Sequence, residues 1–384
     1  MDAPRRLEIA KDFLGRSLAG ACATFTGVGL GRFAYVPLFP AMVLAGWVEA
    51  AGAGLLGAAN LAGYLAGALG GRSVARRLGV ARALDLGMAA TALSFAACAV
   101  NGGLAWFTTW RLLAGVSGGI LMALAGPAVQ ETTAPDHRGL SGGLVISGVG
   151  SGIVTASLLM PALIARSLPA AWLALAVLVV LAWLFAHPRW PQAAPPERMP
   201  LARPTEIRLL LTYGLAGAGM VPHMVYLGDF AMRALGFGSS IASLVVLLFG
   251  LGAISGTLVG GHSVDRLGAD AALRLWLALQ VVALAFAVFP HIVSLSISSF
   301  LGGFFGIGIT GVVIGWTREL TGANAGLVWS QATAAFALAQ ATMGLVFAFV
   351  FARSHSHVAL FALGLSFSVL AFGIAMIWSD KART

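Results

Sequence analysis

One arginine lies within a long stretch that carries no other charge. Arg32 belongs to the segment "GVGLGRFAYVPLFP", residues 27–40, and is the one charged residue between Ser17 and Trp47. A guanidinium near the centre of a bilayer costs roughly 2.5 to 3.5 kcal/mol on insertion scales, so it needs a compensating partner. We expect Arg32 either to face a wet cavity and bind an anionic or strongly polar substrate, or to form a structural ion pair with an acid such as Asp229.

A second arginine, Arg111, lies in another apolar segment. Gly115 and Gly119 follow it at four-residue steps, so the three residues share one face of a helix. Two roles stay open: Arg111 could donate to backbone carbonyls of a neighbouring helix, or it could join Arg32 at a substrate. Two buried arginines with few nearby acids would make a positive cavity, which favours anions.

The segment "GAGMVPHMVYLGDF", residues 217–230, holds two groups that could carry a proton. A histidine changes its charge near neutral pH, which suits His223 to a coupling site. Asp229 could do the same if it is removed from water. The alternatives are a neutral, hydrogen-bonded His223 and an ion pair of Asp229 with Arg233, one helical turn further on.

Several further polar residues in apolar segments could contact a substrate. Each of them could instead make a hydrogen bond between helices. They are Tyr35, Asn60, Tyr64, Tyr226, Gln280, Trp316, Trp329, Gln331 and Gln340. The predicted substrate contacts are Arg32, Tyr35, Asn60, Tyr64, Arg111, His223, Tyr226 and Gln331.

No set of residues in the sequence suggests catalysis. The apolar segments lack a paired histidine and acid with a third metal ligand, and no Ser/His/Asp set is indicated. His355 and His357, in "RSHSH", form a metal pattern without further ligands. We therefore expect neither enzyme activity nor a metal or other cofactor.

Membrane-spanning helices must position these residues. Apolar residues make up 59% of the chain and charged residues 10%, and the mean hydropathy of +0.91 exceeds that of soluble proteins. Windows of about 20 apolar residues are long enough to cross a hydrocarbon layer of about 30 Å. We predict twelve such helices, at residues 17–43, 52–71, 83–103, 105–130, 139–165, 168–186, 207–232, 240–262, 271–290, 292–316, 326–352 and 357–378.

The basic residues predict the orientation of these helices. With the N-terminus inside, 18 of the 23 lysines and arginines fall in the inside connections and tails, and three fall on the opposite face. Both termini should therefore be cytoplasmic, in a protein that crosses the membrane many times. This asymmetry accounts for the net charge of +9, so we expect no nucleic-acid partner.

The two halves of the chain repeat one another. "GGRSVARRLG" at 70–79 matches "GGHSVDRLG" at 260–268, at an offset close to half of the 384 residues. The proline- and arginine-rich segment between the halves cannot span a membrane. We predict an all-α integral membrane protein with two pseudo-symmetric six-helix halves, residues 1–186 and 207–384, joined by a cytoplasmic linker at 187–206.

Several segments carry a resemblance to a known superfamily. "GGHSVDRLG" resembles the loop signature of the major facilitator superfamily, with Gly261, Asp265, Arg266 and Gly268 at the expected spacing. "RLLAGVSGG", which begins at Arg111, looks like that superfamily's fourth-helix motif. "GLGRFAYVPLFPAM" followed by "AANLAGYLAGALGG" is similar to the bacterial YbfB/YjiJ-type branch. The resemblance covers the whole chain and implies the major facilitator fold, with the first helix lining a central cavity.

The same resemblance implies gating residues on the cytoplasmic side. Asp265 and Arg266 should latch the helix ends when the cavity faces outward. In the first half, Arg76 stands where the signature has an acid, so the two gates should differ. We further expect Glu131 and Glu319, at the ends of the fourth and tenth helices, to pair with basic residues such as Arg138 and Arg318.

These features predict a secondary active transporter that moves a small organic solute by alternating access. An anion such as a carboxylate is the first choice, with Arg32 as its charge partner and His223 as the protonation site. The alternatives are a proton-driven exporter of amphiphilic or cationic compounds that uses Asp229, and a non-transporting membrane sensor. The predicted partners are the substrate, protons and the lipid bilayer, and we expect a monomer.

Overall fold

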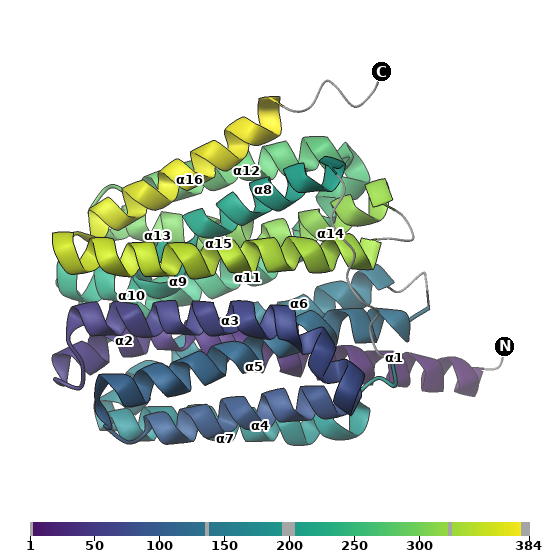
Figure 1. Cartoon of the computed structure of the whole chain (residues 1–384), viewed down its shortest axis with the longest axis horizontal. Coiled ribbons are helices and arrows are strands. Elements are labelled where there is room, and N and C mark those ends of the chain that lie inside the picture. Colours follow the sequence, from purple (N-terminus) through teal and green to yellow (C-terminus); the bar gives the residue numbers. More distant parts are fainter. Residues whose placement is uncertain (1–2, 135–137, 194–203, 322–324, 378–384) are drawn as a thin grey trace.

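The computed structural model describes residues 3–134, 138–193, 204–321 and 325–377, and its regular elements there are helices. Figure 1 shows the helices of the first half lying below those of the second. The first half contains α1 (Ala3–Thr24), η1 (Phe25–Phe33), α2 (Tyr35–Leu44), α3 (Ala50–Leu78), α4 (Val80–Cys98), α5 (Gly103–Glu131), α6 (Arg138–Arg166), α7 (Leu168–Ala186) and η3 (His187–Arg189). The second half contains α8 (Pro204–Gly219), α9 (Val221–Val225), α10 (Leu227–Asp229), η4 (Phe230–Ala234), α11 (Ser239–Leu267), α12 (Ala269–Phe286), α13 (Ile292–Leu301), η5 (Gly302–Ile307), α14 (Gly308–Thr321), α15 (Ala325–Ser354) and α16 (His357–Ile377).

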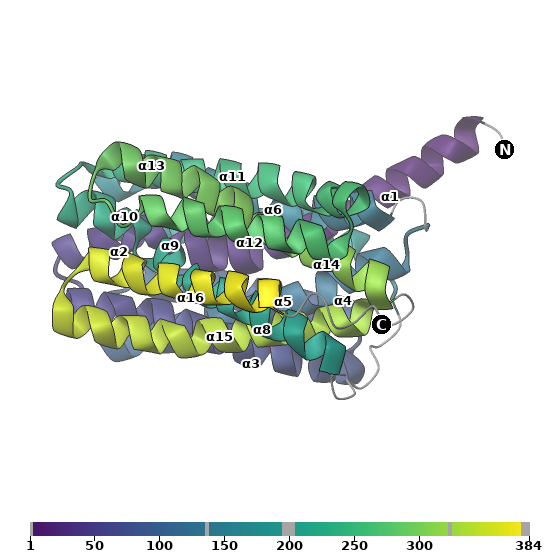
Figure 2. The same cartoon turned by 90° about the horizontal axis from the view of Figure 1, so that it is seen from above.

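The helices run along the long axis of the molecule. α1 begins at one end of the bundle, and α16 runs towards that end from the opposite one, as the two views in Figures 1 and 2 agree. We call this end the terminal end and the opposite one the distal end. α3, α5 and α11 run from the distal to the terminal end, whereas α6 and α15 run the other way.

Eleven segments of the described chain are long and apolar enough to cross a membrane. The remaining predicted crossing, the seventh, is the interrupted run of α8, α9, α10 and η4. Its interruptions fall at Met220 and Tyr226, on either side of Pro222, which lacks the N–H that continues a helix. Backbone bonds such as that from Phe230 N to Tyr226 O, at 2.8 Å, keep the path helical. The chain therefore matches the predicted twelve-helix pattern, with the seventh helix broken.

The first crossing is also irregular. α1 leads into η1, a π-helix that contains Gly27, Gly29, Gly31 and Arg32. A Cβ built on Gly29 would lie 2.9 Å from the Cα of Gly152 in α6, so only glycine permits this approach. π-helical turns occur frequently at functional sites, and this one carries the buried arginine.

The internal repeat is visible in the paired helices α3 and α11. Each has 29 residues, and each ends at a glycine with positive φ, +85° at Gly79 and +78° at Gly268. Glycine adopts this conformation without a steric penalty. The repeated "RLG" of the two loops thus ends equivalent helices in equivalent ways.

Glycines pack helices both within and between the halves. Within the first half, two glycines four residues apart bring helices close together: Gly63 and Gly67 of α3 face the backbone of α5. Between the halves, α3 packs against α15, and α6 packs against α11. Gly150 faces Ile254 and Gly344 faces Ala58 in these two seams. These glycines of α3 thus contact a helix of their own half, and other glycines line the seams between the halves.

The outer surface suits contact with lipid. α7 exposes Leu173, Val177, Leu181 and Leu184 along its length, and such an apolar surface marks a membrane-facing region. The predicted boundaries at 186 and 207 stay predictions, because residues 194–203 lie outside the described part of the chain.

Candidate functional site

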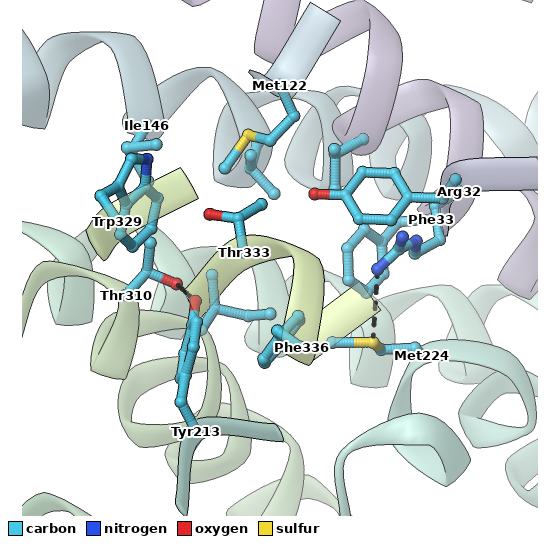
Figure 3. Close-up of a pocket in the computed structure, with 14 residues that line it drawn as sticks. Arg32, Phe33, Met122, Ile146, Tyr213, Met224, Thr310, Trp329, Thr333 and Phe336 are labelled. Atoms are coloured by element: carbon cyan, nitrogen blue, oxygen red, sulfur yellow. Dashed lines mark hydrogen bonds between the residues drawn. The ribbon is translucent and has the colours of Figure 1, made fainter. Parts of the chain in front are cut away.

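A cavity lies between the two halves. The cavity and the open solvent at its mouth together contain about 470 Å³ of space free of protein atoms. Figure 3 shows Arg32 and Met224 at one end and Trp329 and Ile146 at the other. The lining residues are Val28, Arg32, Phe33, Tyr64, Met122, Ile146, Val149, Tyr213, Met224, Ile307, Thr310, Trp329, Thr333 and Phe336.

The cavity extends from Arg32 towards the terminal end of the bundle. Trp329 lies in the second turn of α15, and Ile146 lies near the start of α6. Both helices begin at the terminal end. Since first-half and second-half residues line it together, any movement of one half against the other changes its shape.

Arg32 is the charged residue among those that line the cavity. Its Nη1 donates to Oε1 of Gln340 at 2.8 Å and lies 3.8 Å from Sδ of Met224. Its guanidinium carbon lies 4.4 Å from the centre of the Tyr64 ring. Its Nη2 is buried and makes no hydrogen bond to the residues that the structure describes. The partners that compensate the buried charge of Arg32 are therefore neutral. The alternative prediction, an ion pair between Arg32 and Asp229, is not observed.

The backbone beside Arg32 explains its placement. The carbonyl of Gly31 accepts a hydrogen bond from Nη1 of Arg111, at 2.9 Å, and another from Nδ2 of Asn60, at 3.3 Å. Two side chains from neighbouring helices thus hold the π-helical turn that presents Arg32. The π-helical turn needs such donors because its backbone departs from the regular α-helical hydrogen bonding.

Arg111 does not line the cavity. It is fully buried, and its guanidinium carbon lies over the ring of Tyr35 at 4.6 Å. Of the two roles left open by the sequence, the structure shows the contact with a backbone carbonyl. In this structure Arg111 thus lies outside the cavity that the sequence predicted to hold two arginines, and Arg32 is the one charged residue among the described lining residues.

Other predicted substrate contacts lie away from the cavity wall. Tyr35 donates to the carbonyl of Ala53 at 2.9 Å, and Asn60 also donates to that of Arg111 at 3.2 Å. Tyr226 packs between aromatic rings, and Gln331 is buried in α15 without lining the cavity. Of the predicted contacts, the structure places Arg32 and Tyr64 on the cavity wall.

The sequence analysis missed most of the wall. Tyr213, Met224, Thr310, Thr333 and Phe336 line the cavity but resemble ordinary residues of apolar helices. Tyrosine occurs only four times in the chain, so the rarity of this residue could have pointed to Tyr213.

His223 lies away from the cavity wall in an aromatic environment. Its Nε2 is 2.9 Å from Oγ of Ser298, and its ring packs against Phe249 and Phe361. Its Nδ1 is buried and has no hydrogen-bond partner among the described residues. This arrangement matches the alternative of a neutral, hydrogen-bonded His223. The role of His223 in proton coupling stays a prediction.

Asp229 forms a buried cluster near the distal end. Both of its carboxylate oxygens accept hydrogen bonds from Arg233, one of them at 2.6 Å. Oδ2 also lies 2.6 Å from Nε2 of His357, the first residue of α16. The predicted ion pair with Arg233 is therefore present. His357, considered in the sequence only for metal binding, is a partner that the sequence analysis missed.

The two halves pack closely near the distal end. The ring of Tyr226 lies 5.6 Å from that of Phe39 in the first half and 5.1 Å from that of Phe351 in the second. A Cβ on Gly228 would lie 2.8 Å from the carbonyl oxygen of Val36. These contacts close the distal side, whereas the cavity extends towards the terminal side.

The predicted gating residues lie at the terminal end. Asp265 and Arg318 form an exposed ion pair at 2.6 Å that joins α11 and α14 of one half, so Arg318 binds Asp265 rather than Glu319. Arg76 donates to Ser73 within α3 at 2.8 Å. Arg266 and Glu319 are exposed, Glu131 ends α5, and Gly261 lies within α11. The side chain of Arg138 lies outside the part that the structure describes.

The twelve-helix pattern in two similar halves, with a cavity between them, defines a membrane transporter of the major facilitator type. The family model described as "Uncharacterised MFS-type transporter YbfB" matches residues 24–377, so the chain belongs to this family. The predicted resemblance is thereby confirmed.

Solved structures show the same fold. A D-xylose–proton symporter aligns with a TM-score of 0.72 and 16% identity, over 96% of each chain. The human organic anion transporter MFSD10 (TETRAN) aligns with a TM-score of 0.67 and 20% identity, over 98% of this chain and 100% of that one. The comparison with curated proteins found no match. At these identities, the likeness establishes the fold.

Proposed function

We propose that this transporter moves a small organic anion across the bacterial inner membrane, with both termini in the cytoplasm. The observation that carries the proposal is the environment of Arg32. This buried guanidinium lies on the cavity wall, its partners are an amide, a thioether and an aromatic ring, and its Nη2 is unused among the described contacts. A buried cation without a paired acid favours an anionic ligand.

The arrangement of the two halves supports alternating access. The halves are tightly packed at the distal end, and the cavity extends towards the terminal end, so this conformation suits a cavity facing the cytoplasm. Rocking of the halves along the α3–α15 and α6–α11 seams would close the terminal side and open the distal side. The major facilitator fold of the D-xylose–proton symporter and of the organic anion transporter supports such a movement.

A proton gradient is the energy source that we propose. The hydrogen bond between Asp229 and His357 joins an acid and a base on two different helices, and such a pair can bind or release a proton as the helices move. We favour this pair over His223, whose described neighbours are a hydroxyl and aromatic rings. We also propose that the protein contacts the lipid bilayer, binds no nucleic acid and is a monomer.

The alternative of a cation exporter has less support. It requires the carboxylate of Asp229 to attract a cationic substrate. That carboxylate is fully buried, binds Arg233 and His357, and is not on the cavity wall. Its charge is thus already compensated.

A stability screen of the detergent-purified protein tests the proposal. Matched panels of carboxylates, phosphates, amines and lipophilic cations are compared in wild type, Arg32→Gln, Arg32→Lys and Arg353→Gln. A ligand at about 100 times its Kd should add about 2.7 kcal/mol to native stability. We expect stabilisation by anions that is lost in Arg32→Gln and retained in Arg353→Gln, which removes an exposed arginine outside the cavity. Stabilisation by cations that survives Arg32→Gln would contradict the proposal.

A further inference from the structure

The cavity wall away from Arg32 is aromatic. Tyr213 and Phe336 stack with ring centres 4.5 Å apart, and Trp329 lies 6.4 Å from Tyr213. These three residues come from α8 and α15 of the second half. Figure 3 shows Trp329 and Tyr213 on the side of the cavity away from Arg32, with Phe336 and Thr333 between them and Arg32.

This aromatic wall has few polar groups, and some of them already have hydrogen-bond partners. The hydroxyl of Tyr213 lies 3.2 Å from that of Thr310, so the two satisfy one another. What the wall then offers to a ligand is mainly ring faces and edges. Such surfaces bind planar aromatic groups by stacking and edge-to-face contacts.

The charge of the cavity limits the charge of its ligand. Among the described lining residues, Arg32 is the one cation, and Arg111 donates to the backbone away from the cavity. A second carboxylate on the ligand would therefore meet no cation in the described wall, and burying it without a partner is unfavourable. A single negative charge matches this site.

One further polar atom is available between the two ends. The hydroxyl of Thr333 is buried and has no hydrogen-bond partner among the described residues, and it lies on the cavity wall. It can bind a polar substituent on the body of a ligand, but as a neutral group it adds no charge selectivity.

We propose that the substrate class is an aromatic monocarboxylate, with its carboxylate on Nη2 of Arg32 and its ring against Tyr213, Phe336 and Trp329. This inference rests on the proposed function, because it assumes that Arg32 binds an anion. It adds that the anion contains an aromatic ring and that it carries one negative charge.

Binding of matched small carboxylates tests both additions. Isothermal titration of the purified protein compares benzoate with cyclohexanecarboxylate, which has a saturated, non-planar ring with the same number of carbons, and with phthalate, which adds a second carboxylate. Acetate and succinate represent small hydrophilic anions, and benzyl alcohol represents an uncharged arene. We expect benzoate to bind about tenfold more tightly than cyclohexanecarboxylate and more tightly than all the others.

Variants then locate the selectivity. Phe336→Leu and Trp329→Leu keep an apolar side chain but remove a ring, so each should reduce the preference for benzoate while binding still depends on Arg32. Trp106→Leu removes an exposed tryptophan outside the cavity and should leave the preference unchanged. Using two ring variants keeps the test informative if one of them does not fold.

The outcomes separate the inference from the proposed function. Tighter binding of acetate or succinate than of benzoate, with all binding lost in Arg32→Gln, would overturn the aromatic substrate class and leave anion transport standing. Equal binding of benzoate and cyclohexanecarboxylate would overturn the role of the rings. Binding that is unchanged in Arg32→Gln would overturn the proposed function itself.

Discussion

Arg32 and Gln340 share a hydrogen bond of 2.8 Å across the interface between the two halves, although 308 residues separate them in the chain. Arg32 belongs to the π-helix η1 of the first crossing, and Gln340 belongs to α15 of the eleventh. The amide of Gln340 also donates to Sδ of Met224 at 3.0 Å. This contact with a neutral amide holds the guanidinium in place without cancelling its positive charge. The charge therefore remains able to attract an anion.

Replacing Gln340 with an acid should therefore block the site. Gln340→Glu places a carboxylate next to Arg32, and the resulting ion pair should weaken anion binding by about tenfold or more, since 1.4 kcal/mol corresponds to that factor. Titration of the purified variant with benzoate measures the change. Gln340→Met, similar in length and neutral, is the control and should bind anions far better than Gln340→Glu. Equal affinities of the two variants would show that Arg32 does not supply the charge for binding.

Arg111 should act on the site through the backbone. Arg111→Met removes a donor to the Gly31 carbonyl, and losing a hydrogen bond from a charged group should lower stability by about 1.5 to 3 kcal/mol. Anion affinity should fall as well, because the turn that presents Arg32 loses one of its two donors. Thermal unfolding and benzoate titration measure the two effects. Asn60→Ala removes an uncharged donor that contacts the Gly31 carbonyl at 3.3 Å and the Arg111 carbonyl at 3.2 Å, and it should show a smaller loss of anion affinity. Unchanged stability in Arg111→Met would contradict this role.

The Asp229–His357 pair predicts that anion binding is coupled to proton binding. If the pair takes up a proton as the halves move, addition of benzoate at pH 7 should produce proton uptake, measured with a pH dye in weakly buffered solution. Asp229→Asn and His357→Gln should abolish this uptake while leaving benzoate binding within a few fold, since neither residue lines the cavity.

A neighbouring histidine provides the control for this experiment. His355 is exposed and lies two residues before His357, and its backbone has a positive φ of +50°, which asparagine also adopts readily. His355→Asn should retain the proton uptake of wild type. Uptake that persists in His357→Gln and disappears in His223→Gln would instead assign the proton to His223.

The fold was predictable because its signals are strong and local. Long apolar windows, the repeated loop ending in Gly79 and Gly268, and the positive residues at the ends of the helices all follow from the cost of placing polar groups in lipid. Arg32 was predictable for the same reason, since a lone charge in such a window requires a function or a partner. The break in the seventh helix coincides with Pro222, a residue visible in the sequence.

The wall of the cavity was not predictable from the sequence to the same degree. In a membrane protein, lipid-facing and interior faces of a helix are both apolar, so the pattern does not reveal which side faces a cavity. In the sequence, Phe336 and Thr333 therefore resemble packing residues. The polar residues Tyr35 and Asn60 are predicted to contact a substrate, but in the structure their side chains donate to backbone carbonyls. The link between His357 and Asp229 joins residues 128 positions apart, a contact that no local pattern indicates.

The glycines of α3 offer a final test of the packing. A Cβ on Gly67 would clash with the backbone carbonyl of Val116 in α5, whereas a Cβ on Gly70 would meet no atom within 4 Å. Gly67→Ala should therefore push α3 and α5 apart and destabilise the protein by about 1 to 3 kcal/mol. Gly70→Ala should be neutral or stabilising by up to about 1 kcal/mol, because alanine favours the helix. Thermal unfolding of the two variants in the same detergent measures the difference, and equal unfolding temperatures would contradict the close approach of α3 to α5.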